Sequence, residues 1–381
     1  MKIATITCHH VYNYGATLQA FALQQYLLSM GLESEIIDFI PWYHKRYEFW
    51  HINRNSSHYD TLNKNVFLKL IWCLRYNLPY LLKEYKRKFA FDKFDSNYLK
   101  FTKRKYSNIE ELKSFPPVAD MYICGSDQIW NQDATFGIEK AYYLDFGESD
   151  TYRMSYAASF GCDQIHADPD ELKSLIDKFD FISIREKSGI NILRKLGFSD
   201  IRLVVDPVFL LSTTQWYIYA RSSRQIKTPE KYILLYNFKQ NDKIRRFVME
   251  LKSNLNLPIV CLHGYDEIQY ADINIRDAGP FEFIKLIESA EVIVSDSFHA
   301  TVYSIIFNKE FYTFSLCGQN NTARMEDLLN GLDIRNRLNV EIPSSEKIDY
   351  NDVTKRLQPM IDKSKDFLHI IEKVRNHRPV N

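Results

Sequence analysis

The chain has 381 residues, of which 45% are hydrophobic and 25% are charged, and its formal net charge is +1. This is the composition of a globular protein, and the length is sufficient for two domains. A net charge so close to zero offers no general attraction for nucleic acid, so no nucleic-acid partner is expected.

Two further features concern the compartment. The six cysteines include no C-x-x-C pair, which favours reduced thiols in the cytosol over a disulfide framework or a zinc site. No apolar run approaches the ~18 residues of a membrane span, and Met1–Thr7 is too short for the apolar part of a signal peptide. We therefore expect a cytoplasmic protein that does not cross a bilayer.

The first 40 residues predict a parallel β-α-β unit. Ile3–Thr7 and Glu35–Phe39 are the predicted strands, and Leu18–Met30 is an amphipathic helix that ends at Gly31. The turn at residues 13–16 leads into this helix, where backbone N–H groups can face a ligand. The chain has no G-x-G-x-x-G motif, so the dinucleotide-binding fingerprint is absent.

Residues 42–105 interrupt this pattern with a basic, aromatic-rich insertion. Residues 66–75 and 81–94 predict one or two amphipathic helices, with Trp, Phe and Leu on one side and Lys and Arg on the other. Such helices can lie on an anionic membrane, so residues 66–94 are a candidate for peripheral contact at the inner face of the membrane. Packing on the domain with a solvated basic face explains the same pattern equally well.

The α/β pattern returns after Pro117. Four more strands are predicted, at residues 120–124, 152–160, 181–184 and 201–205. Polar or charged residues follow three of these strands, namely Ser126 with Asp127, Arg185, and Asp206. Parallel strands place their carboxyl ends at one edge of a sheet, so these residues are expected to line one crevice.

A second α/β series begins near residue 230, after an expected connection at residues 210–228. Its strands and helices are predicted at residues 232–236, 242–255, 259–262, 281–290, 292–294 and 311–314. The whole pattern predicts an α/β fold of GT-B-like architecture, in which two Rossmann-like domains face each other across a cleft. We expect domains at residues 1–209 and 210–381, with a helix at 353–374 that returns to the first domain.

The segment Ser295–Ala300 lies where an apolar strand gives way to a new helix. His299 is therefore expected at a helix N-terminus, beside free backbone N–H groups and the positive end of the helix dipole. That place suits an anionic ligand. The alternative is that His299 only caps the helix or fills a gap in the packing.

In their order and spacing, six motifs resemble those of the polysaccharide pyruvyl transferases, at residues 13–16, 125–131, 155–161, 182–186, 206–207 and 295–300. The resemblance implies a GT-B protein that transfers pyruvate from phosphoenolpyruvate to a hexose of a cell-surface polysaccharide or its lipid-linked precursor, forming a cyclic ketal. One departure is plain. Better-known members have Ser-x-Arg-Leu-His in the last motif, and this chain has Ser297 and Phe298 in place of the Arg and Leu.

The resemblance places the donor on the C-terminal domain, with His299 as the catalytic acid and base. Phosphoenolpyruvate must be protonated at its methylene carbon, and imidazole titrates near neutrality. Arg185 and Arg324 are the candidates to bind the donor's carboxylate and phosphate in place of the missing Arg. The alternatives are an ion pair of Arg185 with Glu186 and a helix-surface salt bridge of Arg324. Supporting hydroxyl donors are expected at Ser295 and Ser297.

The acceptor, an oligosaccharide or a lipid-linked glycan, is expected on the N-terminal domain, where a ring can stack on the sugar and polar groups can meet its hydroxyls. The candidates are Asn13, Tyr14, Gly15, Ser126, Asp127 and Trp130. Asp127 is also a candidate base, although it could instead cap the next helix. Trp130 is more simply explained as a core residue. No metal-ligand cluster is visible, so we expect a metal-independent reaction with phosphoenolpyruvate as co-substrate and no other cofactor.

Two other functions fit the same pattern. A GT-B glycosyltransferase with a nucleotide-sugar donor shares the fold, and fold analogy does not separate the two enzymes. The missing Arg also motivates a non-catalytic, glycan-binding subunit.

Overall fold

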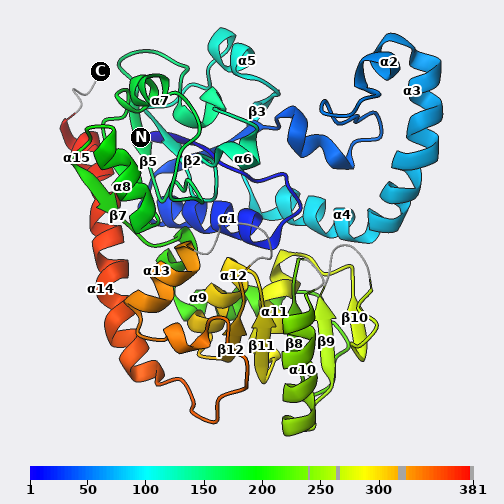
Figure 1. The fold of residues 1–381 in the computed structure, drawn as a ribbon. Coiled ribbons are helices and arrows are strands. Elements are labelled where there is room, and N and C mark those ends of the chain that lie inside the picture. Colours follow the sequence, from blue (N-terminus) through cyan, green and yellow to red (C-terminus); the bar gives the residue numbers. More distant parts are fainter. Residues whose placement is uncertain (239–240, 263–266, 316–322, 378–381) are drawn as a thin grey trace.

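The computed structural model describes residues 1–238, 241–262, 267–315 and 323–377. Two five-stranded parallel sheets organise these residues, one in each half of the chain (Figure 1). The short apolar strands are buried because helices cover both faces of each sheet.

The first sheet has the strand order β3-β2-β1-β4-β5. Its strands are β1 (Lys2–Ile6), β2 (Glu33–Phe39), β3 (Phe101–Tyr106), β4 (Met121–Cys124) and β5 (Tyr152–Ser155). A small sheet of β6 (Ile182–Ile184) and β7 (Ile201–Leu203) is joined to this region by a bridge between Ala158 and Ile184. The helices of this half are α1 (Tyr14–Ser29), α5 (Ile109–Ser114), α6 (Gln132–Thr135), α7 (Pro169–Ile176) and α8 (Lys187–Lys195).

The second sheet repeats the pattern with the order β10-β9-β8-β11-β12. Its strands are β8 (Ile233–Tyr236), β9 (Ile259–Leu262), β10 (Ile273–Ile275), β11 (Val292–Ser295) and β12 (Glu310–Thr313). Its helices are α9 (Thr213–Ser222), α10 (Asp242–Leu255), α11 (Pro280–Ser289), α12 (Phe298–Ile306) and α13 (Ala323–Gly331).

The strand order reverses between β1 and β4 in the first sheet and between β8 and β11 in the second. In an open parallel sheet, the crevice at such a reversal, outside the carboxyl ends of the strands, is where ligands bind. Residues that follow these strands line a common cavity, described below. The predicted α/β fold with two Rossmann-like halves across a cleft is thus confirmed.

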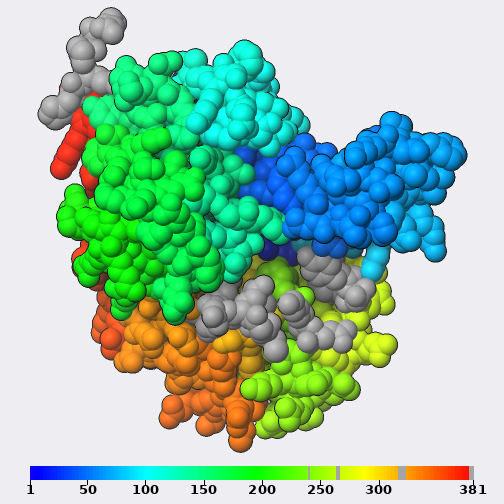
Figure 2. Space-filling model, turned by 45° about the horizontal axis from the view of Figure 1, so that its top comes forward, coloured from blue at the N-terminus to red at the C-terminus, as the bar shows by residue number. Residues whose placement is uncertain are grey.

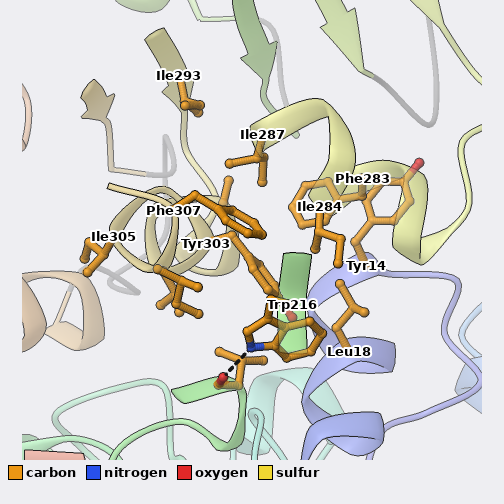
Figure 3. Packing of buried hydrophobic residues seen from close by; sticks show 14 of the residues in the cluster. Tyr14, Leu18, Trp216, Phe283, Ile284, Ile287, Ile293, Tyr303, Ile305 and Phe307 are labelled. Atoms are coloured by element: carbon orange, nitrogen blue, oxygen red, sulfur yellow. Dashed lines mark hydrogen bonds between the residues drawn. The ribbon is translucent and has the colours of Figure 1, made fainter. Parts of the chain in front are cut away.

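The two halves share a continuous apolar core (Figure 3). The Tyr14 ring of α1 stacks on Phe283 of α11 at 4.7 Å between centroids, and its hydroxyl donates to the Ala278 carbonyl at 3.0 Å. The boundary that we expect at residues 209 and 210 falls in the short helix η4 (Pro207–Leu210), which packs against α1.

The C-terminal helices return to the first half of the chain. They are α14 (Tyr350–Leu368) and α15 (Ile370–His377). Leu368 and Ile371 pack in one cluster with Ile3 of β1 and Leu23 of α1. The single helix predicted at 353–374 is therefore two helices, divided at His369.

An arm of residues 59–98 projects from the body of the molecule (Figures 1 and 2). It comprises α2 (Tyr59–Lys64), α3 (Val66–Trp72), the turn η2 (Cys73–Asn77) and α4 (Leu78–Tyr98). The insertion expected at 42–105 is too long, because β3 within it is a strand of the first sheet. β3 has three exposed basic residues in a row, at positions 103–105, so its sequence looks like that of a loop. Charged side chains of this kind are common on edge strands.

Candidate active site

A cavity of about 440 Å³ lies between the two halves of the molecule. Its lining includes Asn13 and Asp127 from the first half and Ser297, His299 and Arg324 from the second. These residues follow β1, β4 and β11 or begin α12 and α13. Five residues that the sequence singled out, from motifs far apart in the chain, therefore share one cavity.

His299 lies in the first turn of α12 and is 6% exposed. Its Nε2 is 3.3 Å from Oδ2 of Asp206, and its Nδ1 lies over Gly15 at the start of α1. The ring lines the cavity instead of being enclosed in apolar packing. Nε2 thus faces a carboxylate, and the Nδ1 edge of the ring packs against Gly15.

Asp206 is the fully buried anion that holds this arrangement together. Its Oδ2 accepts hydrogen bonds from Nη1 of Arg185 at 2.5 Å and from the Ser126 hydroxyl at 3.2 Å. Burial alone would raise the pKa of Asp206, but His299 and Arg185 lower that pKa below its ordinary value. The ionised carboxylate thus orients both the imidazole and the guanidinium.

Gly15 permits the close approach of α1 to His299. A Cβ atom on Gly15 would lie 2.0 Å from Nδ1 and 2.3 Å from Cγ of the ring. Any side chain at this position therefore displaces the imidazole or the helix. Gly15 positions His299, which is a more specific role than the acceptor contact expected from the sequence.

Two arginines lie close to the Phe298 ring; Phe298 and Arg324 line the cavity, and Arg185 does not. The Cζ atoms of Arg185 and Arg324 lie 4.9 Å and 5.4 Å from the ring centroid. Each guanidinium also has a nitrogen 3.8 Å from Oδ1 of Asp127. Burial and the neighbouring Arg185 lower the pKa of Arg324 to about 10, so it stays charged at neutral pH. Two cations thus lie beside the motif in which the family Arg is missing.

Among the described residues, the structure does not contain the two alternative contacts, which were an ion pair of Arg185 with Glu186 and a helix-surface salt bridge of Arg324. Arg185 contacts Asp206 and Asp127, whereas the Glu186 carboxylate accepts from the Phe160 N–H at 2.9 Å. The Arg324 side chain is only 10% exposed, so its ion pair with Asp127 is not a helix-surface bridge.

The serines of the predicted site have different surroundings. Ser297 lines the cavity and caps α12, where its hydroxyl accepts from the Ala300 N–H at 3.4 Å. Ser295 is buried, and its hydroxyl donates to the Tyr236 carbonyl and accepts from the Ser297 N–H. Ser126 is buried beneath the cavity, where it contacts Arg185 and Asp206. Only Ser297 is thus placed to meet a ligand.

Of the residues expected around the acceptor, some line the cavity and others are buried away from it. Asn13 lines the cavity and caps α1, with its Oδ1 accepting from the Gly15 and Ala16 N–H groups. Tyr14 lies in the core between the halves, and Trp130 is 1% exposed and stacked on Tyr143. Neither ring lines the cavity, so neither is a stacking platform in this arrangement.

Asp127 lines the cavity in an uncommon backbone conformation, with φ of 78°. Its Oδ1 accepts from the next N–H, that of Gln128, at 2.9 Å. The position suits contact with a substrate and also places the carboxylate between two arginines.

Sequence reasoning placed Asp206 among the residues of the crevice but gave it no role, and it missed His44. His44 lines the cavity from the short helix η1 (Trp42–Tyr47), and burial lowers its pKa to about 3. Nothing in the sequence around His44 distinguishes it from the rest of the basic insertion.

In the part of the chain that the structure describes, no group of three or more His, Cys, Asp or Glu side chains could hold a metal ion. None of the helices among these residues is long and apolar enough to span a membrane.

Comparison with protein families decides which family these motifs represent. The model of the family described as polysaccharide pyruvyl transferase matches residues 13–318, which include every motif described above. The chain belongs to this family. The match extends from Asn13 at the start of α1 to beyond His299, so it includes most of the residues that line the cavity, whereas Cys8, Val11, Arg324 and Met325 of that lining lie outside it. A search of curated proteins found no match.

Solved structures show the same fold at low sequence identity. UDP-GlcNAc 2-epimerase from Methanocaldococcus jannaschii, in complex with UDP-GlcNAc and UDP, is 13% identical, with a TM-score of 0.51 over 98% of this chain and 100% of the other. The S. aureus MnaA–UDP structure is 11% identical, with a TM-score of 0.51 over 100% of this chain and 99% of the other. These GT-B-type enzymes confirm the predicted fold class.

Proposed function

We propose that this pyruvyl transferase moves pyruvate from phosphoenolpyruvate to a hexose of a cell-surface polysaccharide or its lipid-linked precursor, in the cytoplasm and without a metal, forming a cyclic ketal. The observation that carries the proposal is the His299–Asp206 pair, which lies at the cavity next to two buried arginines. The pair supplies an oriented proton donor, and the arginines supply charge for a donor with a carboxylate and a phosphate.

In this proposal the donor lies near Phe298. Arg324 and Arg185 bind its carboxylate and phosphate. These anions replace Asp127 as the partner of the two guanidinium groups. The N-terminus of α12, with the Ser297 hydroxyl, adds hydrogen-bond donors. These groups replace the Arg that the family motif has at position 297.

The reaction follows from the positions of the acid and the base. His299 gives a proton to the methylene carbon of phosphoenolpyruvate, a hydroxyl of the hexose forms a bond to C2, and Asp127 takes the hydroxyl proton. The C2–O bond to phosphate breaks, and phosphate leaves with that bond pair and the proton from Asp127. The second hydroxyl then closes the ring at C2 and returns a proton to His299. The products are the cyclic ketal and inorganic phosphate.

The first test measures phosphate release from phosphoenolpyruvate in the presence of hexoside acceptors. His299→Gln is expected to lower kcat about 10²- to 10⁴-fold, because it removes the proton donor while keeping the volume of the side chain. The control is His369→Gln, which changes an exposed imidazole on the C-terminal helices. Turnover by His299→Gln at the parental rate would contradict the proposal.

Ligand-induced thermal stabilisation separates the proposal from its alternatives. Phosphoenolpyruvate should raise the melting temperature, and UDP should not. The opposite pattern would indicate a glycosyltransferase that uses a nucleotide-sugar. UDP is the probe because two solved structures of this fold contain it. Binding of a glycan with no turnover of either donor would indicate a non-catalytic subunit.

We also propose that residues 66–94 of the arm contact the surface of an anionic membrane. Large apolar side chains are exposed along this segment, among them Val66 at 73%, Phe67 at 69% and Leu82 at 69%. The arm carries eight Lys or Arg and four Asp or Glu. Exposed apolar side chains beside an excess of basic ones fit an interface with anionic lipid.

A further inference from the structure

A second cavity, of about 150 Å³, lies beside the main one. The two cavities share the lining residues Val11, Asn13, His44 and Phe238, so a ligand in one can extend into the other. The volume is several times the ~30 Å³ that a water molecule occupies in the liquid, which is room for a small polar group. None of the proposed donor-binding residues lines it.

The lining of this second cavity is cationic and aromatic. It contains Arg46 and Arg87 and, among the described residues that line it, no Asp or Glu. Four tyrosines complete it, namely Tyr12, Tyr43, Tyr47 and Tyr236. The main cavity, by contrast, has Asp127 and Asp296 in its lining. An anion therefore meets less like charge in the second cavity than in the first.

Arg87 is a buried cation in the lining of this cavity, and two neighbouring groups fix its position. Its side chain is 8% exposed, its Nη2 donates to the Tyr12 carbonyl at 2.6 Å, and its Nη1 is 3.9 Å from the Glu84 carboxylate. Its Nε has no hydrogen-bond partner among the described residues. A buried guanidinium with hydrogen-bonding capacity left over is costly without a ligand. An anionic ligand in the cavity would compensate this buried charge.

Two further groups assist at the same place. Arg46 is exposed at the rim and stacks over the Tyr80 ring at 4.6 Å. His44 lies between the cavities, and its low pKa, a result of burial, keeps it neutral at physiological pH. A neutral imidazole can both donate and accept hydrogen bonds, as the junction between a sugar and an anionic group requires.

We infer that the second cavity binds a phosphate group attached to the acceptor sugar, with Arg87 as the principal ligand. This inference rests on the proposed function, since the hexose then occupies the main cavity beside Asn13 and His44. Arg87 lies on α4, the helix that joins the projecting end of the arm to the body (Figure 1). A phosphate ester whose other substituent extends along the arm would suit a lipid-linked acceptor better than a neutral oligosaccharide.

The test is calorimetric titration, which does not depend on turnover. The probes are glucose, glucose 1-phosphate and a glucose diphosphate ester of a short isoprenyl chain. Arg87→Gln should weaken binding of both phosphorylated probes about tenfold or more, because a charge-assisted contact is lost. It should leave glucose binding unchanged. A diphosphate ester that binds more tightly than the monoester identifies the lipid-linked form, and the reverse order identifies a sugar phosphate.

Three variants serve as comparisons. Lys88→Gln removes one positive charge from the same helix outside the cavity lining and should change nothing. Arg46→Gln alters an exposed residue at the rim of the second cavity. If Arg87→Gln does not fold, binding of the phosphorylated probes is measured with Arg46→Gln instead. Arg324→Gln should weaken phosphoenolpyruvate binding and leave the sugar phosphates unaffected.

The outcomes separate this inference from the proposed function. Equal binding of the phosphorylated probes by the parental protein and by both Arg87→Gln and Arg46→Gln would overturn the inference. So would loss of their binding in Arg324→Gln alone, since that would place the phosphate in the main cavity. Failure of phosphoenolpyruvate to bind any variant, with Arg87-dependent phosphate binding intact, would overturn only the proposed function.

Discussion

At the scale of single residues, the site depends on how one imidazole is held from two sides. Asp206 faces Nε2 of His299, and the absence of a side chain at Gly15 leaves room for Nδ1. A carboxylate that orients a histidine fixes which nitrogen carries the proton. The chemistry expected of His299 therefore needs residues from three separate segments of the chain.

Gly15→Ala is expected to impair catalysis more than folding. The new Cβ would overlap the ring at Nδ1, so the imidazole must move, and misplacement of a catalytic group by 1 Å can cost about 10²-fold in rate. The measurement is kcat together with the melting temperature. The matched control is Gly331→Ala, whose Cβ would meet its nearest neighbour, Met360, at 3.9 Å. Full activity in Gly15→Ala would show that the close approach is not needed.

The sequence could predict His299 and the two arginines, but not all of their partners. A strand followed by a polar turn and a helix predicts His299 at a helix N-terminus, because that pattern is local. Arg185 and Arg324 could be proposed once the family Arg was seen to be missing. The ion pair of His299 with Asp206 and the contacts of Phe298 with two guanidinium groups depend on residues far apart in the chain. Periodicity carries no information about such contacts.

At the scale of elements, the apolar parallel strands were predictable and the basic insertion was not. The runs at β4, β8 and β11 are continuous and buried, which is the pattern of a covered parallel sheet. β3 was missed because its exposed basic residues mask the pattern. The predicted start of α1 at Leu18 was wrong by one turn, since Asn13 caps the helix before the apolar periodicity begins.

The arm provides a prediction at this scale. The protein should co-sediment with vesicles that contain anionic lipid at low salt and release at high salt, because basic side chains contribute a screened attraction. Phe67→Ser combined with Leu82→Ser should reduce binding, since both side chains are 69% exposed. The control is Ile218→Ser, which alters an exposed apolar residue on α9. Concentration-dependent dimerisation without vesicle binding would instead assign the arm to a second copy of the chain.

At the scale of the whole molecule, the two halves are more continuous than two independent domains. The core cluster in Figure 3 joins Tyr14 and Leu18 of α1 to Trp216, Phe283 and Tyr303 of the second half. Ile371 of α15 packs in one cluster with Ile3 of β1 and Leu23 of α1, so the end of the described chain is also held on the first half. A cavity between two halves needs such a shared support, because its catalytic and binding residues come from both sides.

This continuity predicts a single cooperative unfolding transition. Tyr14→Ala removes a ring stacked across the halves and a buried hydrogen bond, and should lower the free energy of unfolding by about 3–5 kcal/mol, as for other large aromatic truncations. Calorimetry should show one transition that moves to lower temperature, and hydrogen exchange should accelerate equally in β1 and β11. Tyr76→Ala, at a side chain 55% exposed on the arm, is the control. Two separate transitions, or loss of protection in one sheet only, would show that the halves unfold independently and that the interface contributes little to holding the cavity together.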